Sequence, residues 1–125
     1  MQAGKHVILC VDDDEDILYA LRMVLEKNGY VMVSARSAED GRRVYKESKP
    51  DLIVVDLMME EVDAGTHLAK ELKVLQNTKP VYMLSSVGDQ LNQNIDYNAL
   101  GLTGVFQKPI NFDTLLATLK QKLKK

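Results

Sequence analysis

Short runs of apolar residues alternate along this chain with stretches in which apolar residues recur every three or four positions. The runs are rich in β-branched residues and typical of strands buried on both faces of a sheet, whereas the recurring spacing is typical of amphipathic helices. The predicted strands are Val7–Val11, Tyr30–Ala35, Leu52–Val55, Val81–Leu84 and Val105–Phe106. Their alternation with helices predicts an α/β fold: a parallel sheet with right-handed crossovers and helices on both faces.

Capping and turn residues set the expected helix ends. Asn28-Gly29 is expected to close the first helix, because glycine readily adopts the left-handed backbone of a C′ position. Ser37 and Asn111 are expected to cap the second and the last helices at their amino ends. The third helix is expected to follow Gly65-Thr66. Leu91–Leu100 is a weaker helix candidate, since it is rich in Asn and Gln and has few apolar anchors.

Composition and charge narrow the class of protein. The chain is expected to be one domain spanning residues 1–125, and its 46% apolar and 27% charged residues are ordinary for a globular protein. A net charge of −2 provides no general basic surface for direct nucleic-acid binding, and no apolar run approaches the length of a membrane span. The amino terminus lacks the hydrophobic segment of a signal peptide, so we expect a cytoplasmic location.

The cysteine and the two histidines are expected to have structural or surface roles. Cys10 is the only cysteine, which excludes an internal disulfide and agrees with a cytoplasmic location. It lies within an apolar strand, so a buried and inert thiol is expected. His6 and His67 fall in no motif for phosphotransfer or metal binding, and we expect plain surface roles for both.

Polar side chains stand at the carboxyl ends of four of the five predicted strands. In an open α/β sheet these ends meet at one edge, where ligands bind. The side chains brought to this edge are Asp12 and Asp13 from the first strand, Asp56 from the third, Ser85 from the fourth and Lys108 from the fifth. Each has an ordinary explanation alone, as a solvated helix start, a turn residue or a surface lysine. Five such groups at four strand ends favour a functional site.

The chemistry of this set points to a phosphoryl group. Three neighbouring carboxylates repel one another and need a cation, and Mg²⁺ suits them because it takes oxygen ligands and keeps several waters. Asp56 ends a fully apolar strand and is our candidate phosphate acceptor, whose carboxylate attacks phosphorus in line. Lys108 would add a positive charge and Ser85 a hydroxyl to stabilise the transferred group.

The same residues carry a family resemblance. Val11-Asp12-Asp13, Asp56 with Met59, Ser85, and Lys108-Pro109 stand in the order found in CheY-like response-regulator receiver domains of two-component systems. The chain resembles such a domain over nearly its whole length. The resemblance implies a flavodoxin-like, doubly wound, five-stranded parallel sheet with strand order 2-1-3-4-5. It also implies that a histidine kinase or phosphotransfer protein donates a phosphoryl group to Asp56.

The resemblance further implies roles for the surrounding residues. Mg²⁺ would be held by Asp13, Asp56 and the backbone carbonyl of Met58, with Asp12 helping through water. Ser85 and Lys108 would contact the phosphoryl group, and the Lys108-Pro109 peptide bond would be cis. The chain would then be a signalling switch rather than an enzyme, catalysing only its own phosphorylation and dephosphorylation.

The resemblance also implies a binding face that responds to phosphorylation. The expected face comprises the Leu91–Leu100 helix, the fifth strand and the last helix, and it would contact a downstream protein target or output domain. A phosphorylation-dependent dimer is compatible with it. The chain departs from the family at Val105, where an aromatic switch residue usually stands, although Phe106 follows. It also has Glu60 where the family often has proline.

Two other functions are compatible with parts of the sequence. One is a small Mg²⁺-dependent phosphatase of the haloacid-dehalogenase type, because Asp12 and Asp14 are spaced like its paired aspartates; that function would leave Asp56 unexplained. The other is a receiver-like binding module that is never phosphorylated, which the complete set of acceptor residues argues against.

Overall fold

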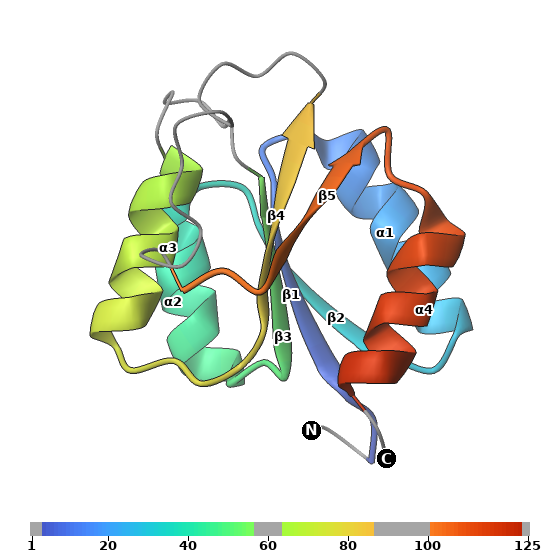
Figure 1. Cartoon of the computed structure of the whole chain (residues 1–125), viewed down its shortest axis with the longest axis horizontal. Helices are drawn as coiled ribbons and strands as arrows, with labels where there is room; N and C mark the ends of the chain where they lie inside the picture. The colour runs from blue at the N-terminus through green and yellow to red at the C-terminus, as the bar shows by residue number, and fades with distance from the viewer. Residues whose placement is uncertain (1–3, 57–63, 87–100, 124–125) are drawn as a thin grey trace.

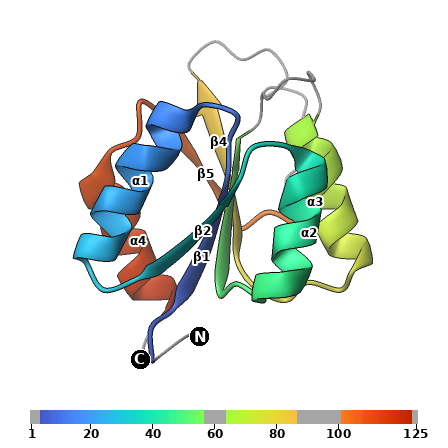
Figure 2. The ribbon, with the colours of Figure 1, turned by 180° about the vertical axis from the view of Figure 1, so that it is seen from behind.

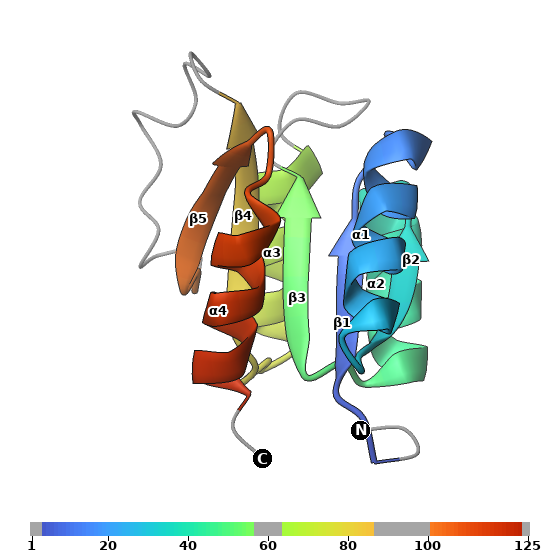
Figure 3. The same ribbon diagram turned by 90° about the vertical axis from the view of Figure 1, so that its right-hand side faces the viewer.

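Five parallel strands form the centre of the molecule in this computed structural model, which describes residues 4–56, 64–86 and 101–123, the side chains of 64–67 and 86 excepted. The strand order is β2-β1-β3-β4-β5. The strands are β1 (Val7–Val11), β2 (Val31–Ala35), β3 (Leu52–Asp56), β4 (Val81–Ser86) and β5 (Gly104–Lys108). Figure 3 shows this order across the sheet, which confirms the flavodoxin-like order 2-1-3-4-5.

Helices cover both faces of the sheet in the described part of the chain. They are α1 (Glu15–Lys27), α2 (Ala38–Ser48), α3 (Ala64–Val74) and α4 (Phe112–Lys122). Figure 1 shows α2 and α3 on one face of the sheet and α1 and α4 on the other, and Figure 2 shows the same layers from behind. The doubly wound α/β architecture is therefore confirmed.

Alternation along the strands divides the core in two, because successive strand residues point to opposite faces. The cluster under α2 and α3 includes Leu9, Val11, Ile53, Val55, Leu68, Leu72 and Met83. The cluster under α1 and α4 includes Ile8, Cys10, Leu21, Leu25, Val54, Leu84, Leu115 and Leu119. β1 and β3 are buried along their whole length, which explains why their sequences are continuous apolar runs.

The predicted helix ends agree with the structure at most positions. Ser37 Oγ accepts a hydrogen bond from the Asp40 N–H at 3.1 Å, and Asn111 Oδ1 accepts one from the Thr114 N–H at 3.1 Å. Gly29 has φ of 87° beyond the end of α1, as a left-handed C′ glycine requires. The predicted start of the third helix is wrong. α3 begins at Ala64 and so includes Gly65-Thr66 in its first turn.

The last two strands are longer than their sequences predicted. β4 continues to Ser86, and β5 runs from Gly104 to Lys108 rather than over two residues. Pairing of Ser85 with Gln107 and of Ser86 with Lys108 extends both strands into the polar edge. The Leu91–Leu100 helix candidate and Met58 lie outside the described residues.

His6 is buried, so its predicted surface role is wrong. It is only 9% exposed, and its Nδ1 lies 3.8 Å from Asp51 Oδ2. The neighbouring Val7 N–H donates to the same Asp51 oxygen at 2.8 Å, which ties the start of β1 to the start of β3. Among the described residues, no helix is long and apolar enough to cross a membrane.

Candidate functional site

Asp12 and Asp56 lie side by side because β1 and β3 are adjacent and parallel. Val11 pairs with Val55, so the residue after each stands at the same edge of the sheet. Asp56 is 3% exposed, and Asp12 is fully buried. Buried carboxylates are rare unless they are paired or bind a cation. Two of them on neighbouring strands therefore require compensation.

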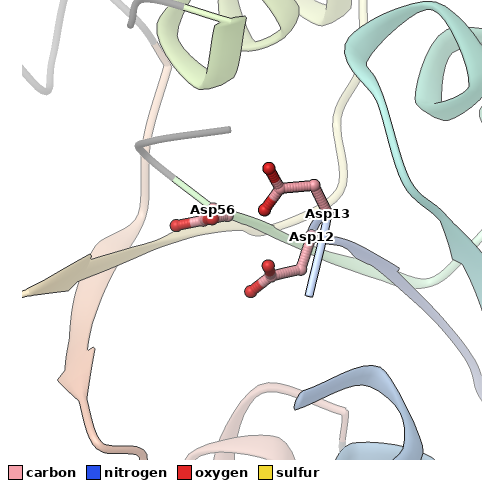
Figure 4. A group of neighbouring side chains, drawn as sticks. All are labelled: Asp12, Asp13 and Asp56. Carbon is pink, nitrogen blue, oxygen red and sulfur yellow. The ribbon is translucent and has the colours of Figure 1, made fainter. Parts of the chain in front are cut away.

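Asp13 completes an acidic cluster with these two residues. Asp12, Asp13 and Asp56 each contribute one carboxylate oxygen, and these three oxygens lie within 4.8 Å of one another. Figure 4 shows the three side chains gathered at the ends of β1 and β3. Asp13 is exposed, so the cluster opens to solvent on its side. The structure thus brings together the three carboxylates that the sequence predicted.

Lys108 provides a positive charge between the two buried carboxylates. Its Nζ lies 3.1 Å from Asp56 Oδ1 and 3.2 Å from Asp12 Oδ2. Partial burial by itself lowers the pKa of Lys108, but the negative charges of Asp12 and Asp56 outweigh it and raise the pKa above its ordinary value. Lys108 is therefore a firmly protonated cation at neutral pH.

The oxygens of Asp12 have two different environments. Its Oδ1 accepts a hydrogen bond from the Asp14 N–H at 2.9 Å, which fixes the side chain. Its Oδ2 is buried and has no hydrogen-bond partner among the described residues, so the ion pair with Lys108 compensates it. A buried oxygen without a hydrogen bond, next to two further carboxylates, suits a hard divalent cation directly or through water. The cluster can therefore hold a metal ion.

Ser85 reaches the same edge from β4. Asp56 pairs with Leu84, so Ser85 lies one residue further along the adjacent strand. Ser85 is buried, with 1% of the residue exposed. The Lys108-Pro109 peptide bond is cis, as expected. Met58, the expected carbonyl ligand, lies outside the described residues.

Val105 and Phe106 face opposite sides of the sheet. Val105 packs against the cluster under α2 and α3, whereas Phe106 belongs to the cluster under α1 and α4. The Phe106 ring stacks on Tyr82 with centroids 4.9 Å apart. A Cβ on Gly104 would lie 2.9 Å from Tyr82 Cε1, so glycine makes room for this ring. Phe106 is thus a packed core residue and does not replace the missing aromatic at Val105.

A mainly apolar cavity beside Lys108 was not foreseen from the sequence. Its volume is about 570 Å³, and it lies between the start of α1 and the connection from β5 to α4. The lining residues are Asp16, Ile17, Ala20, Lys108, Pro109, Ile110 and Phe112. Because these residues come from the two ends of the chain, only tertiary structure brings them together.

Comparison with known proteins agrees with this geometry. Residues 8–120 match the sequence profile of the response regulator receiver domain. The chain belongs to this family. The receiver fold is also found in the crystal structure of a CheY-like response regulator receiver domain protein from Methanospirillum hungatei, with a TM-score of 0.85 and 28% identity, covering 96% of this chain and 94% of that one.

Relatives of two different lengths contain this receiver domain. CheY, the chemotaxis protein of Bacillus subtilis, is 34% identical over 121 residues, which cover 94% of this chain and 98% of CheY. The transcriptional regulatory protein GlrR of Escherichia coli is 33% identical over 116 residues, which cover 93% of this chain but 26% of GlrR. The chain thus spans about a quarter of one relative and nearly all of the other.

As a receiver, the chain is a signalling domain rather than a catalytic enzyme. The phosphatase alternative needed Asp14 as the partner of Asp12. Asp14 is instead the N-cap of α1, and its Oδ1 accepts hydrogen bonds from the Asp16 and Ile17 N–H groups at 2.9 and 3.4 Å. The structure therefore gives Asp14 a capping role, and the phosphatase alternative loses its second aspartate.

Proposed function

We propose that this receiver is phosphorylated on Asp56 by a histidine kinase or a histidine phosphotransfer protein. The observation that carries the proposal is the cluster of Asp12, Asp13 and Asp56, together with the Lys108 ammonium, which lies 3.1 Å from Asp56 Oδ1. A carboxylate needs nearby positive charge to approach a phosphoryl group that is itself negative. Lys108 supplies part of that charge.

The proposed reaction is an exchange of bonds at phosphorus. A carboxylate oxygen of Asp56 forms a new P–O bond, while the P–N bond to the donor histidine breaks and its electron pair returns to the imidazole. The product is an aspartyl phosphate, a mixed anhydride. Lys108 would move its contact from the Asp56 carboxylate to the phosphoryl oxygens, and Ser85 would offer its hydroxyl to the same group.

The proposed ligands of Mg²⁺ are Asp13, Asp56 and the Met58 carbonyl, with Asp12 acting through water. When bound, the ion supplies positive charge that stabilises the phosphoryl oxygens. Two observations support the fit. All the proposed ligand atoms are oxygens, and the buried Asp12 Oδ2 has no hydrogen-bond partner in the part of the chain that the structure describes. Lys108 balances part of the buried negative charge, since its Nζ lies 3.2 Å from Asp12 Oδ2 and 3.1 Å from Asp56 Oδ1.

The proposed output surface includes β5 and α4, together with the Leu91–Leu100 segment. β5 is an edge strand, so its outer side faces away from the described sheet. Lys108 is the last residue of this strand and pairs with Asp56. A phosphoryl group on Asp56 would therefore act directly on the end of β5. The target is a downstream protein, or an output domain if this receiver is part of a longer regulator. A phosphorylation-dependent dimer is a second proposed output.

The test is intact-mass spectrometry after incubation with acetyl phosphate and Mg²⁺. We expect the mass of one phosphoryl group on the unmodified chain and none on Asp56→Asn. Asp16→Asn is a matched control, because Asp16 is exposed on α1 and outside the acidic cluster. Equal phosphorylation of Asp56→Asn would show that another residue is the acceptor.

A further inference from the structure

The outer edge of β2 is a surface that the proposed phosphotransfer does not use. β2 pairs with β1 on one side, and no other described strand pairs with it on the other (Figure 3). Edge strands present open N–H and C=O groups, and proteins commonly protect them with charged residues, prolines or bulges. Val31–Ala35 contains no charged residue or proline, and its register with β1 is unbroken.

The hydrogen-bond pattern shows which groups face outward. The Val31 N–H donates to the His6 carbonyl at 3.0 Å, and the Ala35 carbonyl accepts from the Asp12 N–H at 3.0 Å. Peptide groups of a paired strand alternate between its two sides, so Val31, Val33 and Ala35 bond to β1. The N–H and C=O groups of Met32 and Ser34 therefore point away from the sheet.

A guanidinium group from α1 covers part of this open edge. Arg22 Nη1 donates to the Met32 carbonyl at 3.1 Å, and Nη2 donates to Ser34 Oγ at 3.3 Å. Glu26, one turn along α1, accepts from Nη1 at 3.3 Å and holds the guanidinium in place. Arg22 thus occupies one of the outward carbonyls that an added strand would need.

We propose that the outer edge of β2 is a strand-pairing surface that Arg22 keeps closed, and that the partner it fits is β2 of a second copy of this chain. The charge that protects the edge comes from the neighbouring helix instead of the strand itself. While Arg22 is in place, an incoming strand meets an occupied carbonyl and a fixed positive charge.

The second copy fits because the edge is self-complementary. In an antiparallel arrangement with a two-fold axis at Val33, Met32 of each copy lies opposite Ser34 of the other. The outward N–H and C=O groups of these residues then form four hydrogen bonds, and Val33 stands at a non-hydrogen-bonded position, as its bonds to β1 require. Tyr30 lies opposite Arg36, so no like charges meet across the strands.

Sedimentation velocity on the whole chain over a wide concentration range tests the proposal. Arg22→Ala should shift the mass from the 14.1 kDa of one chain toward twice that value. The dimer dissociation constant should fall at least about tenfold relative to the unmodified protein, the factor expected for one hydrogen bond to a charged group. Arg43→Ala is the matched control, because Arg43 pairs with Glu47 at the same i,i+4 spacing but lies on α2.

A second variant tests whether the edge itself forms the contact. Ser34→Pro in the Arg22→Ala chain removes an outward N–H while leaving the bonds of β2 to β1, and edge strands tolerate proline at such positions. This double variant should return to the monomer mass. If Arg22→Ala stays as monomeric as the unmodified chain, or if Ser34→Pro leaves its dimer intact, the proposal is wrong.

Amide hydrogen exchange gives a readout that does not need the proline variant. In concentrated Arg22→Ala, the Met32 and Ser34 amides should exchange more slowly than in dilute samples. The Val33 amide should change little between these samples, because it is bonded to β1 in both states. A dimer without added protection at Met32 and Ser34 would place the contact elsewhere and overturn the proposal.

Discussion

Lys108 lies between two carboxylates that are removed from water, and its charge is part of what makes the site stable. Asp12 and Asp56 are almost completely buried, and Lys108 Nζ is 3.2 and 3.1 Å from them. Removing one partner of a buried ion pair leaves an uncompensated charge, which is more costly than losing a surface pair. The same lysine is thus structural in the metal-free protein and proposed to be functional during phosphotransfer.

Lys108→Met should lower the free energy of unfolding by about 3 kcal/mol in the absence of Mg²⁺, measured by urea denaturation. Added Mg²⁺ should recover part of the loss, because the ion takes over the compensation of the carboxylates.

The pKa of Lys108 is raised in the folded state, so its contribution to stability is present at neutral pH and disappears only as the pH rises through that raised value. Lys46→Met, an exposed site on α2, should change stability by less than about 0.5 kcal/mol. Similar losses in both variants would contradict the assigned role.

Cys10 should be unreactive in the folded protein. Burial raises the pKa of its thiol from 9.0 to about 12. The unfolded thiol ionises near its ordinary pKa, so the unfolded state loses its proton first and stability should fall as the pH rises from about 9 toward 12. Iodoacetamide at pH 8 should label Cys10 only after addition of denaturant, as read by mass spectrometry. Cys10→Ala should weaken the alkaline loss of stability, and rapid labelling of the native protein would contradict the buried state.

The packing of α2 against α3 depends on one small residue, Gly41. Gly41 is buried in α2, and a Cβ at this position would lie 2.9 Å from Leu68 Cδ2 and 3.1 Å from Val11 Cγ2. Leu68 and Val11 belong to the core cluster under these helices. Glycine lowers intrinsic helix stability, so its presence here reflects the close approach of α2 to the sheet and to α3.

Gly41→Val should destabilise the fold by about 2–3 kcal/mol, because the added methyl groups force Leu68 and Val11 from their packed positions. The measurement is the urea midpoint at constant m-value. Lys46→Val introduces the same side chain at an exposed position of α2 and should cost only about 0.5 kcal/mol of helix propensity. A Gly41→Val midpoint equal to that of the control would show that the helices can separate without loss.

For the whole molecule, Mg²⁺ should act as a stabilising ligand, because the acidic cluster joins the ends of two strands. A ligand that binds only the folded state adds about 1.4 kcal/mol at ten times its Kd. The melting temperature should therefore rise with Mg²⁺ concentration, and Asp13→Asn should reduce the rise. Asp16→Asn removes an equal charge outside the cluster and should leave the rise unchanged. No shift at saturating Mg²⁺ would count against the metal site.

The sequence alone determined the fold class and the edge of the sheet that carries the site. The apolar runs of strands and the three-to-four-residue spacing of helices are local properties of the sequence. The face on which a residue lies depends on its position relative to neighbours one to four residues away. Parallel strands must then place their carboxyl ends together. This is why Asp12, Asp13, Asp56 and Lys108 could be grouped before any distance was known.

Tertiary structure decided the features that depend on residues far apart in the chain. Examples are the burial of His6 beside Asp51, the opposite facing of Val105 and Phe106, and the cavity beside Lys108. Arg22 belongs to the same group, since a charged residue on a helix gives no local sign that it reaches the edge of β2. Such contacts arise only after the chain has folded, because packing and not sequence spacing brings the partners within bonding distance.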